Sequence, residues 1–287
     1  MLLSIDALQM FIEFGTEKGL EMTKKAGFDC VDYPIYWSKF YDTLLGDDFC
    51  AYAKKEKEIL DKNNILCNQA HAPFSKFTYG DKMSVENEDY LKTVRSVKVA
   101  KILGAKYVVI HSVTVPHGVD FEKYNFEFYK SLEKYAEENN IKIAVENLYG
   151  YDEKRQCYTG KLGSPKELCD FVKKLGTKNF TTCIDIGHAA LTGFEPDEFI
   201  MSVDDDLIGV FHIHDNDYRE DLHHLPYFGL FDWDKITKAI AMKNCKCDFS
   251  MEISSHFQHF DKKLFYDVLV LAEKTGRNLI GKINAAK

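Results

Sequence analysis

A repeated junction between helix and strand is the feature that most constrains the fold of this chain. Each junction has an amphipathic helical stretch with lysines in its last turn, then a glycine, then a short apolar run. The junctions lie at residues 24–28, 101–107 and 173–180, and Asn139 with Asn140 takes the place of the glycine before Ile141. Lysines favour the negative end of the helix dipole, and glycine or asparagine adopts the left-handed conformation that ends a helix. The pattern therefore predicts helices that each lead directly into a buried strand.

Eight apolar runs have the length of strands, and each is followed by a helix or by a loop and a helix. They lie at residues 2–5, 28–33, 65–70, 107–110, 141–145, 180–184, 207–211 and 247–251. Continuous apolar runs are typical of parallel strands that are covered on both faces. Eight such units without a break in composition predict an α/β fold, a (β/α)8 TIM barrel that forms a single domain over residues 1–287. A doubly wound open sheet is the alternative, but it usually carries a glycine-rich phosphate loop after its first strand, and none follows residue 5.

The charge and the cysteine content of the chain limit which binding partners and which cellular compartment we expect. The chain has 37 basic and 45 acidic residues, a net charge of −8, so we expect no nucleic-acid partner. It has no apolar run of membrane-spanning length and no recognisable signal peptide, so we expect no membrane partner. Its eight cysteines are scattered, which is typical of reduced thiols in a cytoplasmic protein. Homodimers are the commonest oligomers of soluble proteins, so a homodimer is the assembly to test, although the sequence does not determine the oligomeric state.

Polar side chains follow six of the eight apolar runs, at the strand ends where barrel enzymes hold their sites. These residues are His71, His111, Glu146, Asp185, His188, His212, His214 and Glu252. A single histidine there can be structural, and a single glutamate can cap the next helix. Burying all of them together is costly unless they are paired or bind a cation. The joint pattern therefore predicts a divalent metal site at this end of the barrel.

Asp221 and His223 stand in a polar segment after the seventh run. Their Asp-x-His spacing can present two ligands to one ion from an extended chain. A solvated loop without a ligand role is the alternative interpretation of the same residues.

These motifs resemble those of the xylose-isomerase-like TIM barrels. That superfamily contains sugar-phosphate isomerases and epimerases, inositol-pathway enzymes, ketose 3-epimerases and endonuclease IV. The resemblance runs from Gly27 to Glu252 and rests on Val145-Glu146-Asn147, Asp185-Ile186-Gly187-His188, His212-Ile213-His214-Asp215 and Met251-Glu252. It implies that Glu146, Asp185, His212 and Glu252 bind a divalent metal ion, either Mn, Zn or Mg. It also implies that His71, His111, His188, His214, Asp221 and His223 are additional metal or substrate residues, which would allow up to three ions.

The resemblance implies a metal-dependent isomerase or epimerase that acts on a small sugar or sugar phosphate. Glu146 and Glu252 would be its catalytic residues and would transfer a proton through an enediolate. Two alternatives stay open. The first is a trinuclear zinc phosphodiesterase that cleaves abasic DNA, as endonuclease IV does, although Tyr227 stands where that branch has a glycine. The second is a barrel that binds a sugar or metal without catalysis.

Overall fold

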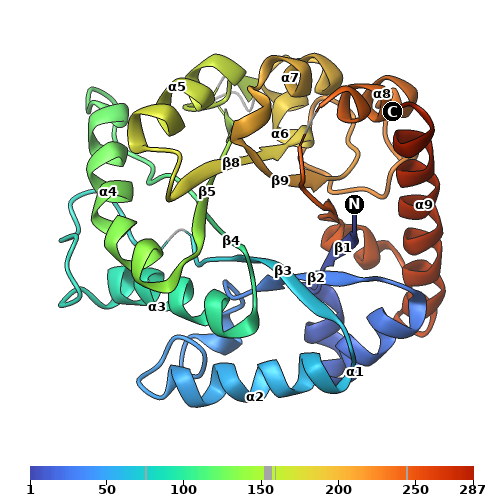
Figure 1. Cartoon of the computed structure of the whole chain (residues 1–287), viewed down its shortest axis with the longest axis horizontal. Helices are drawn as coiled ribbons and strands as arrows, with labels where there is room; N and C mark the ends of the chain where they lie inside the picture. The colour runs from blue at the N-terminus through green and yellow to red at the C-terminus, as the bar shows by residue number, and fades with distance from the viewer. Residues whose placement is uncertain (75, 152–156, 159, 244) are drawn as a thin grey trace.

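The computed structural model describes residues 1–74, 76–151, 157–158, 160–243 and 245–287. Within them, eight parallel strands close into a barrel in the order β1-β10-β9-β8-β5-β4-β3-β2, and helices form a ring around it (Figure 1). The predicted (β/α)8 barrel is confirmed. The barrel strands are β1 (Leu3–Asp6), β2 (Cys30–Pro34), β3 (Leu66–His71), β4 (Tyr107–Ile110), β5 (Lys142–Glu146), β8 (Phe180–Asp185), β9 (Ile208–Ile213) and β10 (Phe249–Met251). Every one of them overlaps a predicted strand.

Helices connect successive barrel strands along the outside. They are α1 (Leu8–Ala26), α2 (Phe49–Lys62), α3 (Glu88–Leu103), α4 (Phe121–Asn139), α5 (Pro165–Leu175), α6 (Ile186–Leu191), α7 (Pro196–Ser202), α8 (Trp233–Met242) and α9 (Phe265–Ala285). Short 3-10 helices lie at η1 (Ser38–Phe40), η2 (Asp205–Leu207), η3 (Ser254–His259) and η4 (Lys262–Leu264). In the described part of the chain, no helix is both long enough and apolar enough to cross a membrane.

Most of the predicted helix ends are confirmed. Gly27, Gly104 and Asn140 have φ angles of 115°, 98° and 46° and end their helices in the left-handed conformation. The prediction was wrong for Gly176, whose ψ of 118° lies outside that region. Its carbonyl instead accepts a hydrogen bond from the Phe180 N–H at 3.2 Å, so an extra turn separates α5 from β8.

A two-stranded antiparallel sheet was not predicted. It pairs β6 (Gly150–Tyr151) with β7 (Cys157–Tyr158) in the long segment between β5 and α5. Strands of two residues have no hydrophobic periodicity, which explains why the sequence pattern did not indicate them.

Candidate metal centre

Strand periodicity brings four polar side chains to the same face inside the barrel. A small buried cluster of Val109, Ala144, Cys183 and Val210 comes from the adjacent strands β4, β5, β8 and β9. Side chains two positions apart on a strand share a face. The residues two positions further along are His111, Glu146, Asp185 and His212. The apolar cluster therefore forms the floor on which these four polar side chains stand.

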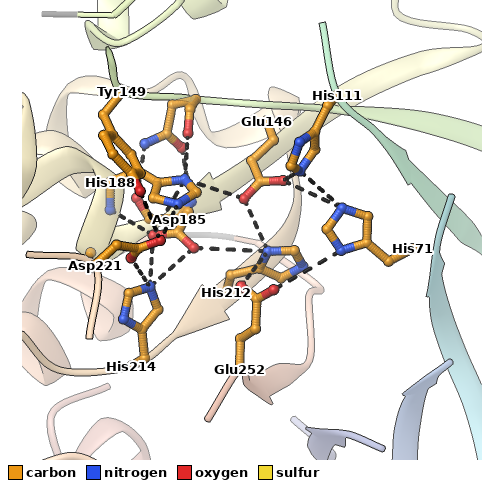
Figure 2. A network of polar contacts seen from close by, with 12 residues as sticks. His71, His111, Glu146, Tyr149, Asp185, His188, His212, His214, Asp221 and Glu252 are labelled. Carbon is orange, nitrogen blue, oxygen red and sulfur yellow. Dashed lines mark hydrogen bonds and ion pairs between the residues drawn. The ribbon is translucent and has the colours of Figure 1, made fainter. Parts of the chain in front are cut away.

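The four residues implied as ligands of one ion lie together (Figure 2). The Nδ1 atom of His212 is 3.2 Å from Glu146 Oε1, 3.1 Å from Glu252 Oε2 and 3.9 Å from Asp185 Oδ2. Asp185 and His212 are completely buried and Glu146 is 1% exposed. We call this group the central cluster. Its position at the carboxyl ends of the strands is where the sequence predicted a site.

The charges of the central cluster are strongly coupled. Burial alone would raise the pKa of Glu146, but the His111 and His212 imidazoles outweigh it and hold that pKa well below its usual range. Burial would also raise the pKa of Glu252, and His212 with His223 lowers it instead. For His212, burial favours the neutral form, yet Cys183 and then Glu252 and Glu146 raise its pKa well above the ordinary value. Negative charge around the ring therefore favours a cation at this position.

The central cluster fits a divalent metal ion. Glu146 Oε2 and Glu252 Oε2 are buried, and neither accepts a hydrogen bond of good geometry from the described residues, because His111 Nε2 at 2.9 Å and His212 Nδ1 at 3.1 Å make ion-pair contacts only. A buried acceptor in that state carries a desolvation cost of about 1–3 kcal/mol, which a bound cation would remove. Three carboxylates and one imidazole are a donor set that suits Mn, Zn or Mg.

Backbone and side-chain contacts fix the orientation of Asp185. Its Oδ1 accepts a hydrogen bond from the His188 N–H at 2.7 Å, so Asp185 also caps α6. Its main chain exchanges two hydrogen bonds of 2.8 Å with the Asn147 side chain. The Nε2 atom of His214 lies 3.1 Å from Oδ1 and 3.2 Å from Oδ2 of the same carboxylate. His214 therefore positions a residue of the central cluster.

A second group, His71, His111 and Glu146, lies beside the central cluster. His111 Nε2 is 2.9 Å from Glu146 Oε2 and 2.9 Å from His71 Nε2. Burial, and then the nearby His111, lowers the pKa of His71 to about 4. His71 is thus held in the neutral form that binds metals. The donor atoms of the three residues all lie within 4.8 Å of one another.

A third group, His188, Asp221 and His223, lies on the other side. Asp221 Oδ2 is 3.0 Å from His223 Nε2, 3.5 Å from His188 Nε2 and 3.3 Å from the Tyr149 hydroxyl. Burial opposes the charging of His223, but Glu252 and Asp221 raise its pKa to about 10. The structure thus brings all ten residues singled out in the sequence into one connected network, and their metal and catalytic roles stay predictions.

Asp6, Asp32 and Gln69 are functional candidates that were not singled out from the sequence. Asp32 Oδ2 lies 3.5 Å from His212 Nε2 and accepts a hydrogen bond of 2.7 Å from Gln69 Nε2. Asp6 ends β1, accepts a hydrogen bond from the Tyr36 hydroxyl at 3.3 Å, and has a pKa of about 7, raised by burial, Asp32 and Glu252. Asp6 and Asp32 stand at or near the ends of the first two barrel strands. A search for polar residues at the ends of all eight strands, as was done for the other six, would have found Asp6 and Asp32.

A cavity of about 330 Å³ opens onto the network. Among its lining residues are Glu146, Glu252, His188, Tyr36 and Tyr149. A neighbouring cavity of about 350 Å³ shares three lining residues with it, namely Phe74, His111 and Leu148. Cavities of this size are typical of small-molecule sites.

Comparison with known proteins identifies the family of this chain. A family model described as "Xylose isomerase-like TIM barrel" matches residues 20–264. The chain belongs to this family. The resemblance seen in the sequence is confirmed.

Two relatives have no assigned activity in their names. Uncharacterized protein y4fM of Sinorhizobium fredii is 30% identical over 204 residues, which cover 66% of this chain and 62% of the relative. Uncharacterized protein MJ1311 of Methanocaldococcus jannaschii is 29% identical over 162 residues, which cover 53% of each chain. The chain thus spans less than two thirds of the length of either relative.

Solved structures with the same fold include several sugar epimerases. A D-tagatose 3-epimerase-like protein superposes with a TM-score of 0.77 at 20% identity, with 99% of both chains covered. A D-psicose 3-epimerase solved with D-fructose gives 0.75 at 16% identity over 98% of this chain and 100% of the other. The IOLI protein, solved with a bound zinc atom, gives 0.75 at 18% identity over 99% of both chains. At these identities the likeness establishes the shared fold.

Proposed function

We propose that this protein is a metal-dependent isomerase or epimerase of a small sugar or sugar phosphate. The observation that carries the proposal is the convergence of Glu146 and Glu252 with Asp185 on the single Nδ1 atom of His212, where both glutamates also line the cavity. Support comes from the family and from solved relatives of the same fold that are named as ketose 3-epimerases.

The central cluster supplies what proton transfer at a sugar carbon requires. A C–H bond next to a carbonyl is a weak acid, and negative charge develops on the sugar oxygens as the proton leaves. A divalent cation held by Glu146, Asp185, His212 and Glu252 would polarise the carbonyl and stabilise that charge. The same cation would orient the substrate over the two glutamates.

Glu146 and Glu252 are the acid–base pair in this proposal. Both glutamates line the cavity, so each can exchange a proton with a substrate bound there. One glutamate takes the proton from the carbon, and the other passes a proton taken up from solvent to the opposite face of that carbon to give the epimer. Delivery to the neighbouring carbon, with proton transfer between the two oxygens, gives the isomer.

Other side chains of the cavity bind and orient the substrate. His188, Tyr36 and Tyr149 line it and offer hydrogen-bonding groups to sugar hydroxyls. Phe74 and Leu148 line both this cavity and the neighbouring one and offer apolar contact at the junction between them. If the substrate is larger than a simple sugar, its non-reacting portion would extend into the neighbouring cavity, which Phe77, Val113 and Phe128 help to line.

Deuterium exchange tests the proposal. Wild-type protein loaded with Mn or Zn is incubated in D2O with a panel of ketoses, aldoses and their phosphates, and label is measured at the carbons next to the carbonyl. We expect Glu146→Gln to abolish exchange and leave the far-ultraviolet circular dichroism unchanged. Glu56→Gln is the matched control, because Glu56 is a part-buried glutamate that hydrogen-bonds Tyr33 away from the cavity. Persistent exchange in Glu146→Gln contradicts the mechanism, and metal-loaded wild type without exchange on any sugar supports a barrel that only binds.

A second candidate function is hydrolysis of a phosphodiester. Two groups beside the central cluster favour this function, because they provide ligands for two more ions. They are the second group, His71 with His111 and Glu146, and the third group, His188 with Asp221 and His223. The net charge of −8 opposes tracking along DNA. Metal analysis by mass spectrometry separates the candidates when it is combined with an abasic duplex assay. Three zinc ions with duplex cleavage would replace the sugar proposal, and a single ion without cleavage would exclude the hydrolase.

A further inference from the structure

A separate cluster of three histidines lies outside the network described above. His224 follows β9, where its backbone exchanges hydrogen bonds of 2.8 and 2.9 Å with Asp215. His256 and His259 lie on η3, after β10. The His224 ring centroid is 5.6 Å from that of His256 and 5.3 Å from that of His259, and the last two are 6.2 Å apart. Side chains from two segments far apart in the chain thus converge at one point.

Buried nitrogens of this cluster lack partners. His224 Nδ1 and both ring nitrogens of His256 are buried without a hydrogen-bond partner among the described residues. His256 is only 2% exposed, and the Phe228 and Phe260 rings pack against it at 4.8 and 5.4 Å. A neutral imidazole has one donor and one acceptor, so leaving both unsatisfied costs about 1–3 kcal/mol for each. These ring nitrogens therefore remain available to bind a ligand that is not one of the described protein groups.

The spacing of the rings fits a shared metal ion. Three imidazoles that bind one tetrahedral ion through bonds of about 2.1 Å have ring centroids roughly 5 Å apart. The three ring planes are inclined to one another by 76°, 63° and 65°, so none of the rings stack. We propose that His224, His256 and His259 bind one divalent transition-metal ion of the zinc type, at a site distinct from the cavity.

The donor set defines the class of ion. Imidazole nitrogens without carboxylates suit Zn, Co, Ni or Cu and do not suit Mg, Ca or Mn. Burial, together with His224 and His259, lowers the pKa of His256 to about 4, so this ring is a free base at neutral pH. His259 is exposed and His224 half-buried, which gives an ion and a fourth, water ligand a route from solvent.

The ion would fasten together two segments that carry residues of the network. His224 directly follows His223, and His256 comes four positions after Glu252. An ion bound between them limits the separation of these two segments. The inference depends on the geometry of the three imidazoles alone and holds whichever reaction the cavity performs.

Metal counting tests the site. Wild type, His259→Gln and His256→Phe are loaded with zinc, dialysed against metal-free buffer and analysed by mass spectrometry for zinc per chain. His117→Gln is the matched control, because His117 is an exposed histidine on the loop before α4. We expect both cluster variants to lose one equivalent of zinc that wild type and His117→Gln retain. After loading with manganese, all four proteins are expected to hold equal amounts.

Two further measurements keep the cluster separate from the cavity. Asp185→Asn and Asp185→Asn/His259→Gln share the same altered cavity, so after loading with Cu²⁺ the double variant should hold one equivalent of copper less than the single variant. Circular dichroism and melting temperature establish that each variant is folded. If folded His259→Gln and His256→Phe retain as much zinc as wild type, the proposed site does not exist. Failure of sugar exchange in the wild type would leave this result untouched.

Discussion

Replacing Gly187 with alanine tests whether His214 positions the central cluster. Gly187 lies in the first turn of α6, between Asp185 and His188. A Cβ atom there would lie 1.9 Å from His214 Cε1 and 2.5 Å from His214 Nε2. Ordinary contact begins at 3.4 Å, so the ring must move by about 1.5 Å. His214 is completely buried and stacks on His223 at 4.1 Å, which leaves it no free space.

The expected effect follows from the hydrogen bond that this movement breaks. His214 Nε2 lies 3.1 Å from Asp185 Oδ1, and a shift of that size removes the contact. Losing a residue that orients a metal ligand typically lowers metal affinity by about 10–100-fold, or about 1.4–2.7 kcal/mol. We therefore expect the Gly187→Ala variant to bind zinc or manganese in the central cluster about 10–100-fold more weakly.

Competition with a chelator of known affinity measures this change. Gly281→Ala is the matched control, because a Cβ atom at Gly281 in α9 meets nothing within 4 Å. That variant should keep the wild-type affinity and gain up to about 1 kcal/mol of stability from the better helix former. If Gly187→Ala binds metal as tightly as wild type, either His214 does not position Asp185 or Asp185 is not a ligand.

Three other predictions follow from the same structure. Removing bound metal with a chelator should lower the melting temperature, and adding zinc should restore it. At an ion concentration of 100 times Kd, the bound ion contributes about 3 kcal/mol to the free energy of unfolding. An unchanged melting curve would contradict a resident ion. Trp233→Phe should lower the free energy of unfolding, measured by urea denaturation, by about 2 kcal/mol, because the indole N–H donates a 2.8 Å hydrogen bond to the buried Asp215 carboxylate. A decrease below about 0.5 kcal/mol would mean that the hydrogen bonds from the Tyr227 and Phe231 backbone N–H groups satisfy this carboxylate without the indole. Burial raises the pKa of Asp6 from its ordinary value of 3.8 to about 7 in the metal-free fold. Because the folded state binds this proton more tightly than the unfolded state, the free energy of unfolding of wild type decreases as pH rises from about 4 to 7. Asp6→Asn removes this loss, so its stability relative to wild type should increase between pH 5 and pH 8, on the order of 3 kcal/mol, and equal pH slopes in the two proteins would refute the assignment.

The local pattern of the sequence was sufficient for the barrel elements. All eight barrel strands overlap their predicted runs, and Ser164 caps α5 by accepting a hydrogen bond from the Glu167 N–H as its capping-box sequence indicates. Asp261 likewise accepts a hydrogen bond from the Lys263 N–H and caps the 3-10 helix η4, which comes just before α9. Features set by neighbours in the chain are therefore readable from the chain.

The candidate site was only partly readable. Its ten singled-out residues were found because they follow apolar runs or match family motifs. Asp6 and Asp32 were missed although they stand at or near the ends of the first two barrel strands. Gln69 was missed because its 3.0 Å contact with His212 joins residues far apart in the chain. The cluster of His224, His256 and His259 was missed for the same reason, since it joins two separate segments.

The amino-acid sequence by itself determined the order and approximate positions of the barrel strands and their helices, and most of the side chains that stand at the carboxyl ends of the strands. It did so because caps, periodicity and helix propensity act over a few neighbouring residues. Only the tertiary structure decided that β1 closes against β10 and that Glu146, Asp185 and Glu252 surround one nitrogen of His212. It also decided their charge states, because burial and the distance between charges set a pKa and both arise only when remote segments pack together.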